Sequence, residues 1–373
     1  MAKLLIVVNE DRFFLSHRKD IALRAQQEGI DVTVVCKDTG RHSEIKAMGL
    51  PVIDLPVNPT GMSLLEDLKT YRFLSKLYKE YKPDLVHHVG LKNILWGGLA
   101  AKHQKVHGVV NAVSGLGVLF SGYKPSLLAS AILRVMAYSS NRPRVKAIFQ
   151  NPEDQSLFIM KDVVQVDQCE FIKGSGVSMR EYGFVPEPDE GKLRVIFTAR
   201  MLKEKGVLTL IEAANLLRKD YANKVEFILC GGLSNNPNGV KKEELERLCD
   251  GHYIQWLGYR SDIKQLLESS HIMAFPSYYR EGVPRSLIEA CAVGRPIVTC
   301  DSIGCKDAVD DGVNGYLIRP RDAFALAEKL KKLFDCSSLR RLMGAKGRVK
   351  AEMEFDLDFV LDKHMEIYRS LLI

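Results

Sequence analysis

The sequence predicts an α/β protein made of two doubly wound domains, each with a parallel sheet covered by helices on both faces. Three observations indicate this class. At 373 residues the chain is too long for one ordinary domain and suits two of average size. Short runs rich in Val, Ile and Leu alternate with helical patterns throughout, as buried parallel strands and their crossover helices do. The alternation pauses once, near residue 185, and then restarts.

The first half contains seven strand candidates. The first, Lys3–Asn9, is only briefly apolar before the chain turns charged, which favours a β-strand over a signal peptide. Helical patterns cover Leu64–Tyr81 and Ser126–Tyr138. The other strands are expected at Asp31–Cys36, Pro51–Leu55, Asp84–Val89, Val106–Val113, Val145–Asn151 and Cys169–Lys173.

The pause lies at Gly183–Lys192, which is expected to join the two domains and to act as a hinge. Domains are therefore expected at 1–185 and 190–355, with the final helix, 356–373, crossing back to the first domain. The second-half strands are expected at Leu193–Arg200, Val225–Cys230, Tyr253–Tyr259, His271–Pro276 and Pro296–Cys300. Closing helices are expected at Ala323–Phe334, Ser338–Glu352 and Asp356–Leu371.

Composition and charge narrow the class further. With 46% apolar and 27% charged residues and no apolar run near the ~20 residues that span a bilayer, the chain is expected to be soluble. The eight cysteines form no C-x-x-C pair, so we expect free thiols in a reducing compartment. Residues 1–180 carry 24 Lys and Arg against 17 Asp and Glu, which is the entire net charge of +7. This half could meet nucleic acid, a diphosphate or a membrane, or simply be a soluble surface.

Two glutamates provide the strongest local signal. The strand at His271–Pro276 leads into a loop that bears Glu281, and a helix that opens near Pro284 carries Glu289. Carboxylates accept hydrogen bonds from sugar hydroxyls well, and the helix N-terminus offers N–H groups to a phosphate. Without its neighbours, Glu289 would be taken for an ordinary solvated helix residue. The spacing nevertheless permits both carboxylates to reach one hydroxylated ligand.

This segment, Phe275–Ala290, resembles the E-x7-E signature of retaining family-4 glycosyltransferases of the GT-B fold. Ala292–Val298 resembles the glycine-proline turn that follows in that family, and Gly312–Leu317 resembles its D-G-x-N-G-x-L element. The resemblance is strong over residues 193–335 and weaker over 1–180. It implies two Rossmann-like domains that face each other across a cleft. The first domain would bind the acceptor and the second the nucleotide sugar.

Arg200 and Lys205 match the diphosphate-binding pair of this family. Physical chemistry agrees, because an arginine at a strand end and a lysine just before a helix can converge on phosphate oxygens. Their charge would stabilise the departing nucleoside diphosphate. By the resemblance Glu281 faces the donor sugar and Glu289 the ribose. The other residues implied to contact the donor in the second domain are Gly258, Tyr259, Arg260, Gly282 and Val283.

The first domain departs from the usual pattern, because the stretch after its first strand, Asn9–Arg18, contains no glycine. We interpret this stretch as a loop. Its F-x-x-H-R form resembles the branch that acts on polyprenyl-diphosphate-linked sugars in capsule, O-antigen and bacterial protein glycosylation. Ser16 and His17 are the implied acceptor contacts, and His88 and Lys92 are further candidates; His87 is expected to be a buried core histidine. Gly115 and Gly117 resemble the glycine turn of that branch beside the donor, although an ordinary turn would explain them as well.

A membrane contact is expected in the first domain. Apolar residues between Leu119 and Met136 precede Arg142, Arg144 and Lys146, and Arg134 lies among them. An amphipathic segment on an anionic leaflet has this composition, although a core-facing helix explains the apolar positions equally well. The expected place of action is the cytoplasmic face of the inner membrane. No nucleic-acid partner is expected.

No metal or other cofactor is expected, because no His/Cys cluster has metal-ligand spacing. The D-x-D motif at Asp356–Asp358 lies far from any strand end and is interpreted as a helix start. The sequence therefore predicts a retaining, metal-independent transferase. It would move a hexose or N-acetylhexosamine from a nucleotide-diphosphate donor, with UDP the expected carrier, onto a polyprenyl-diphosphate-linked saccharide. An epimerase of the same fold, a transferase with a soluble acceptor and a non-catalytic nucleotide-sugar-binding module are the alternatives.

Overall fold

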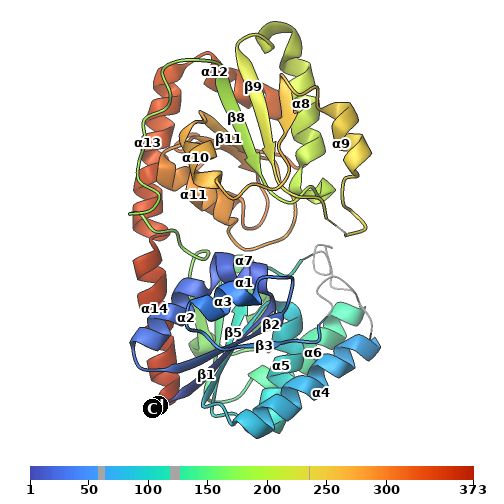
Figure 1. Cartoon of the computed structure of the whole chain (residues 1–373), viewed down its shortest axis with the longest axis vertical. Helices are drawn as coiled ribbons and strands as arrows, with labels where there is room; N and C mark the ends of the chain where they lie inside the picture. The colour runs from blue at the N-terminus through green and yellow to red at the C-terminus, as the bar shows by residue number, and fades with distance from the viewer. Residues whose placement is uncertain (58–63, 118–126, 235) are drawn as a thin grey trace. The chain divides into compact units, whose positions relative to one another are not determined.

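The computed structural model describes residues 1–57, 64–117, 127–234 and 236–373. The chain divides into two compact units, which are described separately. Unit 1 comprises Met1–Ser175 and Asp358–Ile373, and unit 2 comprises Gly176–Leu357. Each unit has a parallel sheet with helices on both of its faces (Figure 1). The predicted fold class is thereby confirmed for each domain.

In unit 1 the described strands form one seven-stranded parallel sheet in the order β3-β2-β1-β4-β5-β6-β7. The strands are β1 Lys3–Glu10, β2 Asp31–Lys37, β3 Val52–Asp54, β4 Leu85–Val89, β5 Gly108–Val113, β6 Val145–Phe149 and β7 Cys169–Phe171. The helices are α1 Asp11–His17, α2 Lys19–Gln27, α3 His42–Ala47, α4 Leu64–Tyr81, α5 Leu91–His103, α6 Leu127–Ser140, α7 Pro152–Met160 and α14 Leu357–Leu372.

Strand β4 shows how the two faces of this sheet are covered. Its adjacent histidines point to opposite faces, as the period of two requires. His88 contacts Tyr78 of α4, whereas His87 contacts Tyr368 of α14. Helices α4 and α5 thus cover one face, and the final helix returns to cover part of the other.

In unit 2 the described strands form a six-stranded parallel sheet in the order β10-β9-β8-β11-β12-β13. This is the doubly wound order with its reversal between β8 and β11. The strands are β8 Leu193–Thr198, β9 Val225–Cys230, β10 Ile254–Trp256, β11 Ile272–Phe275, β12 Ile297–Cys300 and β13 Gly315–Ile318. The helices are α8 Val207–Tyr221, α9 Lys242–Leu248, α10 Ile263–Glu268, α11 Arg285–Val293, α12 Ala323–Phe334 and α13 Ser337–Glu354. Helices α8 and α12 pack together, and α11 packs with α13 (Figure 1).

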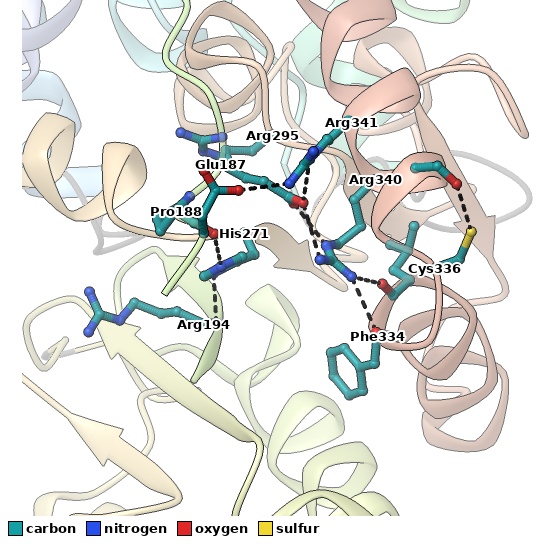
Figure 2. A network of polar contacts seen from close by, with 12 residues as sticks. Glu187, Pro188, Arg194, His271, Arg295, Phe334, Cys336, Arg340 and Arg341 are labelled. Atoms are coloured by element: carbon teal, nitrogen blue, oxygen red, sulfur yellow. Dashed lines mark hydrogen bonds and ion pairs between the residues drawn. The ribbon is translucent and has the colours of Figure 1, made fainter. Parts of the chain in front are cut away.

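The segment that the sequence suggested as a linker is bonded into unit 2 (Figure 2). Glu187 accepts hydrogen bonds from Nε of Arg340 at 2.8 Å and from Nε of Arg341 at 3.2 Å. Arg295 donates to the carbonyl of Pro186 at 3.2 Å, and His271 contacts the carbonyl of Pro188 at 3.1 Å. The predicted boundary near 185 therefore moves, because the chain changes units at 175–176 and at 357–358. The proline and acidic residues of this segment therefore belong to a stretch that is hydrogen-bonded to unit 2, and not to a free linker.

Two further features bear on the expectations. Within the described residues, no helix combines the length and apolarity needed to cross a bilayer. All eight cysteines are free thiols, five of them buried.

Candidate active site

The candidate site in unit 2 lies where the strand order reverses, beyond the carboxyl ends of β8 and β11. The backbone N–H of Tyr278, in the loop after β11, donates to the carbonyl of Glu204, in the loop after β8, at 2.9 Å. Gly206 has φ +79°, and a Cβ there would lie 2.0 Å from the carbonyl oxygen of Pro276. Only glycine permits this approach, so the two loops are held as one support.

Lys205 and Glu281 meet on this support. Lys205 Nζ lies 2.5 Å from Oε1 of Glu281, and Lys205 is only 8% exposed. The ammonium also lies 5.3 Å from the ring centre of Phe275 and 5.4 Å from that of Tyr279, which are favourable cation–π positions. Ser277 Oγ donates to the same Glu281 oxygen at 3.4 Å. The lysine is therefore positioned by a carboxylate and two aromatic faces, and Oε2 of Glu281 accepts no hydrogen bond from the described residues.

Arg200 follows β8 and is exposed. Its guanidinium makes no hydrogen bond or ion pair with any residue in the described part of the chain. Burial raises the pKa of Tyr279, and the nearby positive charge of Arg200 opposes that shift. Arg200 thus lies close enough to Tyr279 to act on it electrostatically, beside the Lys205–Glu281 pair, and it can turn toward an anion.

Glu289 lies on α11 and is 8% exposed. Its Oε1 accepts from Arg285 Nε at 2.8 Å and from the Tyr182 hydroxyl at 3.2 Å. Burial raises the pKa of Glu289, whereas the Arg285 charge opposes the rise. Oε2 of Glu289 accepts no hydrogen bond from the described residues, and it is not among the buried atoms that lack a partner, so it reaches the surface. Both glutamates of the predicted pair therefore have one fixed oxygen and one open oxygen.

The other predicted donor residues of unit 2 lie on neighbouring loops. Gly258 has φ +67°, and its carbonyl accepts from the Gly231 N–H at 2.7 Å, which joins the loop after β10 to the loop after β9. Tyr259 is 70% exposed, and Arg260 pairs with Asp262. Gly282 and Val283 are buried directly after Glu281. A Cβ at Gly304 would lie 2.4 Å from the carbonyl oxygen of Gly282, so this loop is closely packed.

In unit 1 the stretch after β1 is a helix, which corrects the expectation of a loop. Helix α1 begins at Asp11 and places Ser16 and His17 in its last turn. Ser16 Oγ lies 2.6 Å from His17 Nδ1, and the His17 ring stacks on Phe13 with the centroids 4.4 Å apart. The absence of glycine is explained by this, because helical residues need no positive φ.

The remaining predicted residues of unit 1 divide into two groups. Gly115 and Gly117 have φ +109° and +65°, so both occupy backbone conformations that favour glycine. Lys92 pairs with Asp67 at 3.1 Å. His88 is fully buried, with its ring nitrogens 2.9 Å from the Tyr78 hydroxyl and 3.0 Å from Asn111 Oδ1. This geometry removes His88 from the candidate acceptor contacts, because a buried ring with both nitrogens paired offers no atom to a ligand.

Both halves of the chain match known protein families. Residues 178–350 match the model of glycosyl transferases group 1, and residues 3–149 match the glycosyl transferase 4-like model. The chain belongs to these glycosyltransferases. These matches favour transfer over the epimerase and binding-module alternatives.

Relatives of this glycosyltransferase cover nearly its whole length. It is 28% identical to N,N'-diacetylbacillosaminyl-diphospho-undecaprenol alpha-1,3-N-acetylgalactosaminyltransferase of Campylobacter jejuni, over 96% of this chain and 98% of that one. It is 24% identical to an Escherichia coli UDP-Gal:alpha-D-GlcNAc-diphosphoundecaprenol alpha-1,3-galactosyltransferase, over 93% and 90% of the chains. Anabaena HepE, solved in complex with UDP, shares the fold with a TM-score of 0.78 at 20% identity, over 99% and 100% of the chains.

Two residues of the glycosyltransferase site were missed from the sequence. Arg285 stands four residues before Glu289 on the predicted helix, and that spacing predicts an ion pair. Tyr182 lies 107 residues away from Glu289, so no local pattern indicates this contact.

A carboxylate cluster in unit 1 was also not foreseen. Potential ligand atoms of Asp11, Asp38 and His42 lie within 4.8 Å of one another. Both Asp11 oxygens are already engaged, because Oδ1 accepts from the Arg12 N–H at 2.6 Å and Oδ2 from the Thr39 N–H at 2.7 Å. The Asp11 carboxylate thus has a local structural role, as the anchor of the loop after β2.

Proposed function

We propose that this glycosyltransferase moves a hexose or N-acetylhexosamine, with retention, from a UDP-linked donor onto a polyprenyl-diphosphate-linked saccharide. One observation carries the proposal. At the strand reversal of unit 2 lie Lys205, Arg200, which has no partner among the residues that the structure describes, and two glutamates that each have one fixed and one open oxygen. Cations suit a diphosphate, and open carboxylate oxygens suit hydroxyl groups.

The cationic pair binds the diphosphate and assists its departure. An ammonium has three N–H donors, and Glu281 takes one of those of Lys205, which leaves two for phosphate oxygens. Arg200 adds a planar fork with five donors. Negative charge grows on the diphosphate as the glycosidic bond breaks, so both cations stabilise the transition state more than the bound donor.

The two glutamates orient the donor in this proposal. The open oxygen of Glu281 accepts from a sugar hydroxyl, and that of Glu289 accepts from the ribose. The turns at Gly258–Arg260 and Gly282–Val283 contact the nucleoside and the sugar largely through backbone groups. These assignments are supported by the open oxygens and by the buried, closely packed loops.

Retention requires that the new bond form on the face that the diphosphate leaves. The acceptor hydroxyl attacks the anomeric carbon as the bond to the phosphate oxygen breaks, and the leaving phosphate oxygen takes the hydroxyl proton. Both named relatives form alpha linkages, and an alpha product from an alpha-configured donor sugar is retention. No metal is needed for this step, because Arg200 and Lys205 supply the positive charge.

The polyprenyl-diphosphate acceptor is supported by the names of these relatives, each of which acts on a diphosphate-linked undecaprenol. In unit 1 we assign the acceptor contact to Ser16 and His17, whose imidazole stacks on Phe13, and Lys92 is a second candidate. Such an acceptor implies that the enzyme works at an anionic membrane, on the cytoplasmic face of the inner membrane.

The proposed membrane surface is α4 rather than the basic residues after α6. Arg142 donates to the Ser139 carbonyl, Arg144 contacts His107 and Lys146 pairs with Glu170, so these cations are engaged locally. Helix α4 instead presents an exposed stripe that holds four cations and, at its start, two leucines; among the described residues only Lys76 of these cations has an ion-pair partner, Glu80 at 3.8 Å. The members of this α4 stripe are Leu65, Leu68, Lys69, Arg72, Lys76 and Lys79. Leu119 and Phe120, which contributed to the expected contact, lie outside the described residues.

A donor panel with product analysis tests the reaction. The enzyme is given UDP-, GDP- and dTDP-linked sugars with a polyprenyl-diphosphate-sugar acceptor, and the product is identified by mass and by its anomeric coupling constant. Transfer from a UDP-linked hexose or N-acetylhexosamine with an alpha linkage is expected. A beta product would overturn retention, and use of only GDP or dTDP donors would overturn the nucleotide assignment.

A further inference from the structure

We infer that Tyr182 is a positioning residue that, together with Arg285, holds Glu289 so that only one of its oxygens faces the ribose of the donor. This inference rests on the proposed function, because it concerns the same nucleotide site. In this inference Tyr182 and Arg285 act on donor binding through the Glu289 carboxylate.

The asymmetry of the Glu289 carboxylate carries the inference. Two donors from different parts of unit 2 converge on Oε1: Arg285 from the preceding turn of α11, at 2.8 Å, and the Tyr182 hydroxyl from the segment before β8, at 3.2 Å. No described donor reaches Oε2. A carboxylate bound through one oxygen cannot rotate without losing both bonds, so the direction of Oε2 is fixed.

Burial strengthens the hold of Tyr182 and Arg285 on the Glu289 carboxylate. Glu289 and Tyr182 are each only 8% exposed, so either group would lose hydrogen bonding if the other moved away. A carboxylate fixed in this way is prepared to accept from one ribose edge carrying two adjacent hydroxyls. Arg285 alone leaves the carboxylate free to turn about its bond to that cation, and the Tyr182 hydroxyl removes this freedom.

The Tyr182 contribution is measurable because it depends on hydroxyls of the ligand. The test compares dissociation constants of UDP and 2′,3′-dideoxy-UDP for the full-length enzyme by calorimetry. Wild-type enzyme is expected to prefer UDP by about tenfold or more, the scale of a hydrogen bond to a charged group. Tyr182→Phe is expected to weaken UDP roughly fivefold while changing dideoxy-UDP by less than about twofold. Arg285→Lys, which keeps the charge, is expected to retain most of the preference for UDP.

Tyr221→Phe is the matched control. Tyr221 is also 8% exposed, belongs to the same unit and donates its hydroxyl to the Asp335 carboxylate at 2.7 Å. It is expected to leave both dissociation constants unchanged, and melting temperatures report whether each variant folds.

The outcomes separate this inference from the proposed function. Equal weakening of both ligands by Tyr182→Phe, or no weakening of either, would overturn the inference and leave the donor assignment intact. The inference also fails if wild-type enzyme binds UDP and dideoxy-UDP equally. Wild-type enzyme that binds neither UDP nor dideoxy-UDP would instead overturn the donor assignment, and the inference with it.

Discussion

Lys205 and Glu281 form an ion pair with 2.5 Å between Nζ and Oε1, although 76 residues separate them in the sequence. The pair connects the loops after β8 and β11, the two strands between which the sheet order reverses. Each of these residues was predicted separately as a donor contact. In the proposed function this pairing positions the lysine before a diphosphate binds, and such preorganisation is what makes electrostatic catalysis effective.

Replacing Arg200 or Lys205 should lower turnover to the same extent but should affect stability differently. Arg200→Ala and Lys205→Ala are each expected to lower turnover roughly 10²–10³-fold, the scale for losing one transition-state donor. Lys205→Ala should also cost about 1–3 kcal/mol of stability, because it leaves Glu281 without its cation. Arg200→Ala should change stability by less than about 0.5 kcal/mol, because Arg200 is exposed. Steady-state kinetics and urea unfolding measure the two effects, and near-normal turnover in both variants would remove this pair from the site.

Stability should fall below pH 6.5 because of three buried histidines in unit 1. Burial lowers the pKa of His88 to about 4 and that of His364 to about 3, and it lowers the pKa of His87 well below its usual value. The groups facing His87 are Tyr368 and His364 of α14, Arg18 and the adjacent His88, and the three charged or chargeable bases oppose its protonation. Below pH 6.5 these histidines bind protons in the unfolded chain but stay neutral in the folded chain. Stability is therefore complete above that pH and is lost as the pH falls.

The size of this loss can be checked by urea unfolding between pH 7.5 and pH 5. Each histidine contributes a slope of up to about 1.4 kcal/mol per pH unit. His364→Phe should flatten the dependence, because it removes one such group, whose Nε2 is buried without a partner in the described structure. Stability that stays constant from pH 7.5 to pH 5 would contradict the burial of these rings.

Membrane binding should depend on the α4 stripe. Changing Lys69, Arg72, Lys76 and Lys79 to Gln should abolish sedimentation with acidic liposomes, because each cation near an anionic surface contributes about 1 kcal/mol. Transfer to a short-chain, soluble acceptor should be preserved. The control changes Arg134, Arg142, Arg144 and Lys146 to Gln, which removes the same charge from residues that are mostly engaged locally. If only the control variant loses binding, the surface suggested by the sequence is the membrane contact after all.

Activity should persist in excess chelator, since Arg200 and Lys205 supply the charge that a metal would otherwise provide. Asp38→Asn, which changes the one exposed member of the Asp11–Asp38–His42 cluster, should likewise keep full activity. Initial rates of dialysed enzyme with and without EDTA measure this. Loss in EDTA and recovery with magnesium or manganese would show that a metal takes part.

The sequence predicted the strands of both sheets because buried parallel strands are runs of Val, Ile and Leu. It missed β13, Gly315–Ile318, whose four residues begin with glycine and were interpreted only as part of a family motif. It misplaced the domain boundary because Glu187 has a buried partner, Arg340, that is 153 residues away. The prediction that His88 contacts the acceptor was wrong for a related reason. Adjacent histidines on an internal strand point to opposite faces, and both faces of this strand are covered by helices.

The residues of the site divide in the same way. The sequence singled out Arg200, Lys205, Glu281 and Glu289 as candidates because each belongs to a contiguous motif at a strand end or at the start of a helix. Tyr182 could not be singled out, because its hydrogen bond to Glu289 exists only once the segment before β8 has folded against α11. The helix at Asp11–His17 was not predicted, because this stretch was interpreted by analogy with the glycine-containing loop that follows the first strand in many proteins of this fold.

The most direct test of the account is transfer to matched acceptors. Wild-type enzyme is incubated with a UDP-linked hexose or N-acetylhexosamine and either a polyprenyl-diphosphate-linked sugar or the same sugar without the lipid diphosphate, and the products are weighed by mass spectrometry. The account predicts one added sugar on the lipid-linked acceptor, with little or none on the free sugar. Equal transfer to both acceptors, or transfer only to the free sugar, would contradict it.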